Sequence, residues 1–196
     1  KMLGLAAVAA AALMAFVGAG TASATQLTDG SGNVLGVGTA ITGESEGTTT
    51  LHPPIGSISC NKSHVGGKVG DAGSATTTVS GTIEALSFTE CNATVHVLKN
   101  GSLEVHTEGS SNNNNGTLTS TGAQVTVVYL GFHCIFSTNN TDLGTVTGSA
   151  TTGGNATLDI KATIPRTGGS SGAFCGTTAA WTGSYKVTEP GTLNIH

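Results

Sequence analysis

Apolar and polar residues alternate in short runs along this chain, and the longest apolar run after the N-terminal segment is QVTVVYLGFHCIF, residues 124–136. Alternate side chains of an extended strand point to opposite faces, and this run is apolar on both. Such a strand is typical of the centre of a packed β core. Its thirteen residues are too few for a helix that crosses a membrane. We therefore predict one central strand, with Val125, Val127 and Tyr129 on one face and Val128, Leu130, Phe132, Cys134 and Phe136 on the other.

Three further segments show the period-two alternation of strands with one buried face. Residues 76–88 change parity near Ala85, which predicts a β-bulge or a turn of the strand into a second sheet. Residues 157–164 alternate without interruption, and Pro165 is expected to end that strand. Near the C-terminus, four residues share one face of a strand: Trp181, Gly183, Tyr185 and Val187.

Residues 93–107 are predicted to form a β-hairpin. A two-residue loop would place Val97 opposite Glu104, whereas a three-residue loop ending at a left-handed Gly101 places Val97 opposite Leu103. The second register keeps the apolar residues on one face, so it is the one we predict.

Together these segments, separated by Gly- and Asn-rich turns, predict an all-β fold in one domain, residues 25–196. We expect a two-sheet antiparallel sandwich, with a closed β-barrel as the alternative. A polar linker, residues 110–116, divides the domain into two halves that end alike, in G-[ST]-L-x-[VI]-H at residues 101–106 and 191–196. Duplication and coincidence within a Thr/Gly-rich chain both explain that likeness.

The N-terminal segment, residues 1–24, has a basic residue, an apolar run and a small-residue A-x-A ending. That order is typical of a secretory signal peptide; a membrane anchor is the alternative, and the small and polar residues that follow favour cleavage. We therefore expect a bacterial protein that is secreted or associated with the cell surface, with no membrane span after cleavage.

The charge balance excludes some partners. The chain has 7 Lys and Arg residues against 11 Asp and Glu residues, a formal charge of −4. The charges are spread evenly and form no basic patch, so neither nucleic acid nor an anionic membrane is an expected partner. The partners that we expect are other copies of this chain or components of the cell envelope.

The four cysteines, Cys60, Cys91, Cys134 and Cys175, predict two disulfides in an exported chain. Three pairings are possible. We favour Cys60–Cys91 with Cys134–Cys175, because each bridge then links one half of the chain. A four-cysteine zinc site would normally show C-x-x-C pairs, and the sequence has none.

No residue pattern predicts an active site. The G-x-S-x-G pattern occurs around Ser45 and Ser170, but both matches lie in polar, Gly-rich stretches without the strand and helix that a nucleophile elbow needs. In the predicted hairpin His96, Glu104 and His106 would share an exposed face. Two imidazoles and a carboxylate suit zinc, yet a solvated polar face explains the same pattern.

Two kinds of carboxylate pattern in the sequence lack the features of a functional site. The pairs Glu44/Glu46 and Glu84/Glu90 lack the sugar-stacking aromatic residues of a glycosidase cleft. Asp29 and Asp71 lie in Gly-rich loops without the ligand ladder of a calcium site. We therefore predict a protein that is not an enzyme, with no cofactor and no metal.

A pattern of cysteine and aromatic residues carries one resemblance. Cys134 and Cys175, followed by W-x-x-x-Y-x-V-x-x-P-x-x-L from Trp181 to Leu193, resemble a group of small exported, Thr/Gly-rich, four-cysteine proteins of actinobacteria. The resemblance implies an exported protein, and it brings with it no established activity and no catalytic or binding residue.

The sequence therefore predicts a non-catalytic extracellular protein with a structural, cell-surface or adhesive role. Exposed Thr-rich strands suit self-assembly through strand edges. The alternative function is a binding module for a glycan or a small apolar ligand, with Trp181 and Tyr185 as the residues that contact it.

Overall fold

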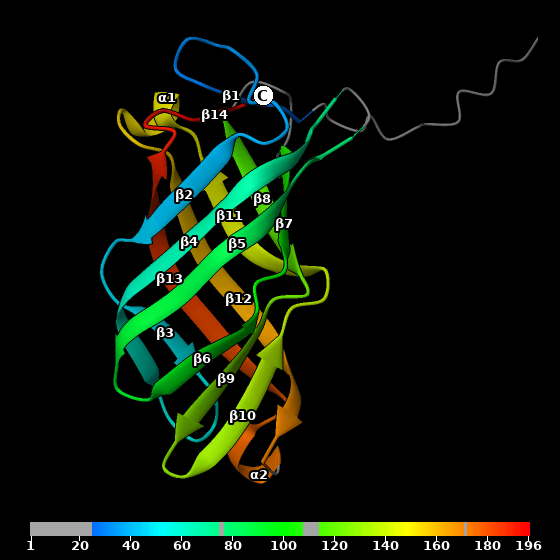
Figure 1. The fold of residues 1–196 in the computed structure, drawn as a ribbon. Helices are drawn as coiled ribbons and strands as arrows, with labels where there is room; N and C mark the ends of the chain where they lie inside the picture. The colour runs from blue at the N-terminus through cyan, green and yellow to red at the C-terminus, as the bar shows by residue number, and fades with distance from the viewer. Residues whose placement is uncertain (1–24, 75–76, 108–113, 171) are drawn as a thin grey trace, which may run out of the picture.

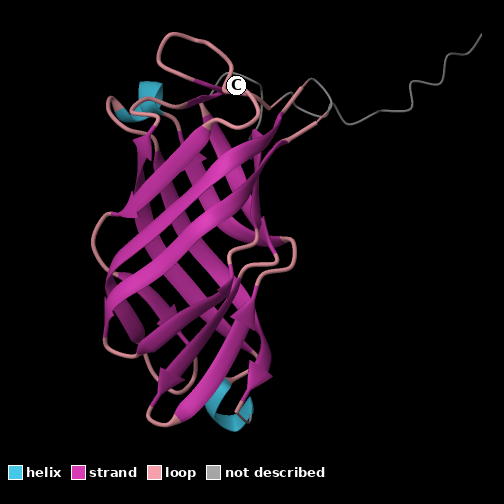
Figure 2. Cartoon of the chain, viewed as in Figure 1, coloured by secondary structure: helices cyan, strands magenta, loops and turns pink. Residues whose placement is uncertain are grey.

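The computed structural model describes residues 25–74, 77–107, 114–170 and 172–196. The predicted signal peptide and residues 110–113 of the predicted linker lie outside these ranges. The described chain is almost entirely β-structure (Figures 1 and 2). Its elements are β1 (Leu27–Thr28), β2 (Ala40–Ser45), β3 (Thr49–His52), β4 (Ile58–Ala72), β5 (Val79–Cys91), β6 (Thr94–Lys99), β7 (Ser102–Thr107), β8 (Asn115–Thr121), β9 (Gln124–Tyr129), β10 (Phe132–Ser137), β11 (Thr141–Thr147), α1 (Ser149–Thr152), β12 (Thr157–Gly169), α2 (Gly172–Cys175), β13 (Thr178–Glu189) and β14 (Asn194–Ile195).

Eight of the described strands close into an antiparallel barrel. The strands follow one another in the order β2–β4–β5–β7–β8–β11–β12–β13, and β13 pairs with β2 to complete the ring. Closure leaves no free strand edge in this ring. The predicted all-β fold is thus confirmed, and of the two architectures considered the chain adopts the closed barrel rather than two separate sheets.

Four of these strands continue below the barrel in the view of Figure 1. β4, β5, β12 and β13 have 15, 13, 13 and 12 residues. Their lower parts pair with additional strands in the order β6–β9–β10–β12–β13–β3–β4–β5. We call this second layer of strands the lower level and the closed ring the upper barrel. No strand pairing joins β5 to β6 among the described residues, so the lower level has a seam there.

The two levels meet where β4 and β5 change register. The pairing moves from Gly66↔Ala85 to Gly67↔Ile83, which leaves Glu84 as the extra residue of a bulge and confirms the predicted change of parity near Ala85. Gly67 is required at this point, because a Cβ atom there would overlap the Thr82 carbonyl group.

The alternation along β12 places its apolar side chains in the core, as predicted. Ile160, Ala162 and Ile164 are buried, whereas the intervening residues are exposed. Pro165 does not end the strand, which continues to Gly169. Pro165 is the last β12 residue paired with β13, so its missing N–H group falls where that ladder ends.

Both predicted disulfides are confirmed. Cys60 and Cys91 are direct partners across β4 and β5, and Cys134–Cys175 joins β10 to α2. The bridges span 31 and 41 residues. In the loop-entropy model, closing loops of this size contributes about 3.5–4 kcal/mol each.

The prediction of a single central strand over residues 124–136 is wrong. The run folds back on itself as the β9–β10 hairpin, with Tyr129 opposite Phe132. Leu130 and Gly131 form the turn with φ angles of 50° and 83°. Two consecutive positive φ angles suit the twist of a two-residue hairpin turn. Gly131 was the residue in the sequence that indicated such a turn.

The predicted hairpin over residues 93–107 is also wrong. β6 pairs with β9 in the lower level, whereas β7 pairs with β5 and β8 in the upper barrel. Val95 and Val97 lie opposite Val127 and Val125. These pairs place apolar side chains opposite one another, as the predicted pairing with β7 would also have done. Gly101 has the predicted positive φ, 78°, but the turn carries the chain from one level to the other.

Among the described residues, no helix has the length and hydropathy that a membrane span requires.

We expect Gly67→Ala to lower the free energy of unfolding by about 2 kcal/mol or more, because the methyl group would force β4 away from β5. The matched control is Gly154→Ala, which meets no atom within 4 Å and should change stability by about 0.5 kcal/mol at most. Urea unfolding measures both. Equal stability of the two variants would show that the close approach at Gly67 is not needed.

Candidate binding site inside the barrel

The upper barrel encloses a cavity of about 110 Å³. Aliphatic side chains from around the ring dominate its lining, among them Ile41, Val65, Val69, Ile83, Leu118 and Val187. Ile41, Val65 and Ile83 point inward and yet retain accessible surface, because the barrel is hollow at this level. An apolar cavity only slightly larger, about 150 Å³, stays free of water and binds benzene or xenon.

A two-stranded lid covers the top of this cavity. β1 pairs with β14, and Leu27 and Leu193 from this region line the cavity. The backbone bonds Gln26 N–H to His196 O, at 2.7 Å, and His196 N–H to Gln26 O, at 2.9 Å, hold the segment before β1 against the residue after β14. The Ile195 amide also donates to Asn114 Oδ1, at 2.8 Å. The lid lies at the top of Figure 1.

A second, smaller cavity of about 70 Å³ lies in the lower level. Its lining includes Phe88, Val95, Val125, Phe136 and Trp181. The Phe88 and Trp181 rings meet edge to face, with centroids 6.1 Å apart and planes at 73°. Because Phe88 and Val95 lie on β5 and β6, this cavity borders the seam between those strands.

Tyr185 lies between the two cavities. It is two residues before Val187 of the upper cavity and four after Trp181 of the lower one, on the same inward face of β13. Its hydroxyl donates to Ser63 Oγ at 2.8 Å, and its ring packs edge to face on Trp181 at 6.4 Å. Burial raises the pKa of Tyr185 to about 12, an effect that its hydrogen bonds with Ser63 and Thr49 reduce. The phenol is therefore neutral at physiological pH.

The two predicted ligand contacts thus have different positions. Trp181 lines the lower cavity and is partly buried. Tyr185 is 3% exposed, donates its hydroxyl to Ser63 and lies between the cavities; its contact with a ligand stays a prediction. Contact of Trp181 with a ligand stays a prediction.

The serine residues of the two G-x-S-x-G matches bond backbone groups. Ser45 Oγ accepts from the Ser63 amide at 2.9 Å. Ser170 Oγ accepts from the His133 amide at 3.0 Å, where it helps to fix the loop after β12.

His96, Glu104 and His106, which the predicted hairpin would have placed on one exposed face, do not all come together. His96 lies on β6 in the lower level, and Glu104 and His106 lie on β7 in the upper barrel. His106 Nε2 is 3.6 Å from Glu104 Oε2, on an exposed surface. The described residues contain no group of three His, Cys, Asp or Glu side chains that could hold a metal ion.

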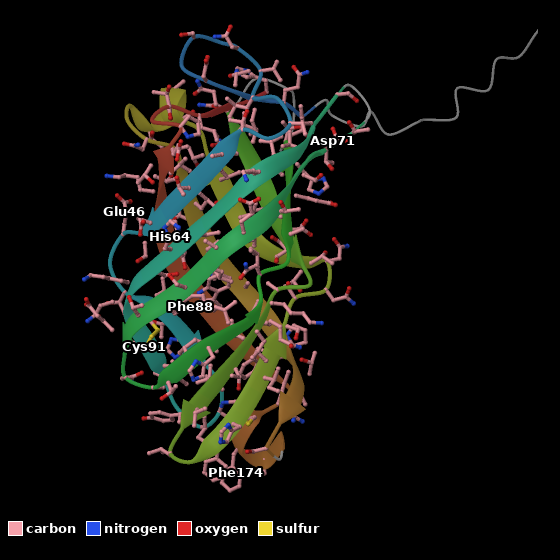
Figure 3. All side chains as sticks on the ribbon, in the orientation of Figure 1. Glu46, His64, Asp71, Phe88, Cys91 and Phe174 are labelled. Carbon is pink, nitrogen blue, oxygen red and sulfur yellow. A yellow bond between two sulfur atoms is a disulfide. The ribbon has the colours of Figure 1, made fainter. Side chains whose placement is uncertain are left out.

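The candidate carboxylates lie on outer surfaces. Glu44 and Glu84 pair with His64 at 2.7 Å and with Lys68 at 2.9 Å, and Glu90 pairs with Lys62. Figure 3 shows Glu46 and His64 beside the outer face of β2 and β4, and Asp71 near the upper end.

Asp29 and Asp71 accept hydrogen bonds from backbone amides that follow them closely in the sequence. Asp29 accepts from the Ser31 and Asn33 amides, and its bond with the Asn33 side chain is the main cause of its lowered pKa. Asp71 accepts from the Gly73 amide at 2.9 Å.

Sequence reasoning missed the residues that line the upper cavity. These residues include Val65, Ile83 and Leu118. Their strands line one common cavity only after the ring of strands has closed. The inward alternation of each strand was visible, but alternation does not show whether the enclosed space is filled.

No family model, no curated protein and no solved structure matches this chain.

We expect Tyr185→Phe to lower the free energy of unfolding at neutral pH by about 1 kcal/mol, because Ser63 loses its partner. The wild-type advantage should persist below about pH 10 and decrease towards pH 12, because the unfolded phenol ionises near 10.0 and the folded phenol near 12. Urea unfolding between pH 7 and about pH 11.5 measures this change. Ser87→Ala, at an exposed position of β5, is the control and should retain the wild-type pH dependence. An unchanged pH dependence in Tyr185→Phe would contradict the assignment of this ionisation to Tyr185.

Proposed function

We propose that this chain is an exported, non-catalytic binding protein that holds a small apolar ligand inside its barrel. The observation that supports this proposal is the cavity of about 110 Å³ within a closed ring of strands. Its lining favours an apolar molecule over a sugar, because a buried sugar would need polar partners for its hydroxyl groups. The aliphatic side chains of the lining provide almost no polar partners for hydroxyl groups.

The free energy associated with a cavity of this size favours binding of a ligand. Protein interiors are normally packed as densely as organic crystals. At ~24 cal/mol per Å³, a void of about 110 Å³ costs roughly 2.6 kcal/mol. A molecule of matching shape would recover much of that free energy through dispersion and desolvation. The lid of β1 and β14 would then shield the molecule from water.

The rest of the chain is consistent with work outside the cell. Two disulfides are compatible with an oxidising compartment. We include export in the proposal on the strength of the signal-like segment, residues 1–24. The resemblance to small exported proteins of actinobacteria points in the same direction and stays a prediction.

The proposal predicts saturable binding of benzene-sized apolar molecules by the oxidised mature protein. Isothermal titration calorimetry with benzene and toluene should show one-site binding, with a negative heat-capacity change because apolar surface is buried. Trp181 emission would change little for a ligand in the upper cavity, since Tyr185 separates the two spaces.

Ile83→Phe, which fills the upper cavity from β5, should abolish binding while leaving the protein folded. Ser87→Ala, on the exposed face of the same strand, should bind as the wild type does. Failure of every ligand tried, or unchanged binding in Ile83→Phe, would contradict the proposal.

A second candidate function is self-assembly into a cell-surface structure. The observation in its favour is β6, which pairs with β9 alone among the described strands and carries the 48% exposed Leu98. A free strand edge can pair with another chain.

Under this second function, sedimentation velocity over a hundredfold concentration range should show ordered polymers. Leu98→Lys should disperse them, because a lysine on an edge strand opposes pairing. A monomer at every concentration would exclude assembly through β6.

A further inference from the structure

Exposed apolar side chains gather at the lower end of the molecule. Leu130, in the β9–β10 turn, is 72% exposed, and Phe174, in α2, is 45% exposed. The Phe174 ring stacks on Phe132, with centroids 4.0 Å apart and planes at 23°. The turn and α2 both lie at the bottom of Figure 1, and Figure 3 shows Phe174 pointing outward there. We call Leu130, Phe132 and Phe174 the apolar tip.

Covalent and hydrogen bonds hold the apolar tip in place. The Cys134–Cys175 disulfide ties the residue after Phe174 to β10, two residues beyond Phe132. The Arg166 guanidinium donates to the carbonyl groups of Gly176, at 2.6 Å, and Ser170, at 3.1 Å. The two phenyl rings therefore remain at the surface without further ordering, which lowers the entropic cost of any contact that they make.

Leu130 is an unusual residue for its position. Its φ of 50° lies in the left-handed region, where Asn, Asp and Gly are favoured in hairpin turns. Leucine is strained there and leaves most of its side chain in water. The turn would form more easily with asparagine, so its own stability does not explain leucine.

The surroundings of the apolar tip are almost without charge. Residues 167–181 contain no charged residue and no histidine, and residues 120–137 contain only His133. The nearby Arg166 is occupied by the carbonyl groups of its own loop. Apart from the exposed His133, these two segments offer no Asp, Glu, Lys or Arg side chain with which an ionic partner could pair.

We propose that the apolar tip inserts into the interfacial region of an uncharged lipid bilayer. Three side chains on a convex end cannot supply the ~800 Å² per partner that a stable protein–protein interface buries. A bilayer accepts a convex end and requires only a few apolar and aromatic side chains to enter it. The inference is independent of any ligand in the barrel.

The binding should be weak and reversible. One myristoyl chain gives an association constant of ~10⁴ M⁻¹ with lipid, and three side chains bury less apolar surface than such a chain. Half of the protein should therefore be bound at roughly millimolar lipid. The binding should not depend on salt, because no charge takes part.

The test is flotation of the oxidised mature protein with vesicles of phosphatidylcholine alone. The variant Leu130→Asn/Phe174→Ser should bind at least about tenfold more weakly, since two apolar side chains are lost. Leu130→Asn suits the turn, so the variant should remain folded. The control is Val37→Ser, because Val37 is also 72% exposed but lies in the loop before β2 at the opposite end.

Three results would overturn the proposal. The wild type could remain unbound at about 10 mM lipid, well above the expected midpoint. Val37→Ser could lose as much binding as the double variant. Sedimentation velocity without lipid could show a dimer that the double variant abolishes, which would assign the apolar tip to a second copy of the chain.

Discussion

Main-chain pairing along four long strands holds the molecule together. β4 and β5 pair over nearly their whole length, and β12 and β13 do the same on the other side of the ring. The upper parts of these strands close the barrel, and their lower parts support β3, β6, β9 and β10. Each level therefore depends on the same two ladders, and a break in either ladder would disturb both.

Because of the bulge at Glu84, β5 directs apolar side chains inward in both the upper barrel and the lower level. Above it, Val79 and Ile83 face the upper cavity; below it, Leu86 and Phe88 face the lower one. The alternation shifts by one residue at the bulge, so both sets of side chains point inward. The Cys60–Cys91 bridge fixes the lower end of the same ladder.

Much of the fold could be predicted from the sequence, because strand alternation and cysteine number are local signals. The inward faces of β12 and β13, both disulfides and the parity change near Ala85 were all predicted correctly. The hairpin over residues 93–107 was predicted wrongly because its apolar pattern has two equally good partners. The apolar pattern of β6 fits β9 as well as β7, so the choice depends on where the chain crosses between levels.

The candidate site could be predicted only in part. Trp181 was identified by its residue type, and it does line a cavity. The larger cavity could not be predicted, because a hollow centre depends on the number of strands in the ring and on how far each side chain reaches across it. Ser63, the partner of Tyr185, is an ordinary serine in the sequence and becomes notable only through the buried contact.

Diffraction from crystals of the oxidised protein under xenon pressure would test the hollow barrel most directly. Xenon enters apolar cavities of this size and scatters strongly. The account predicts a xenon peak between Val65, Ile83 and Leu118, without ordered water there before pressurisation. A cavity that contains hydrogen-bonded water, or that takes up no xenon, would contradict it.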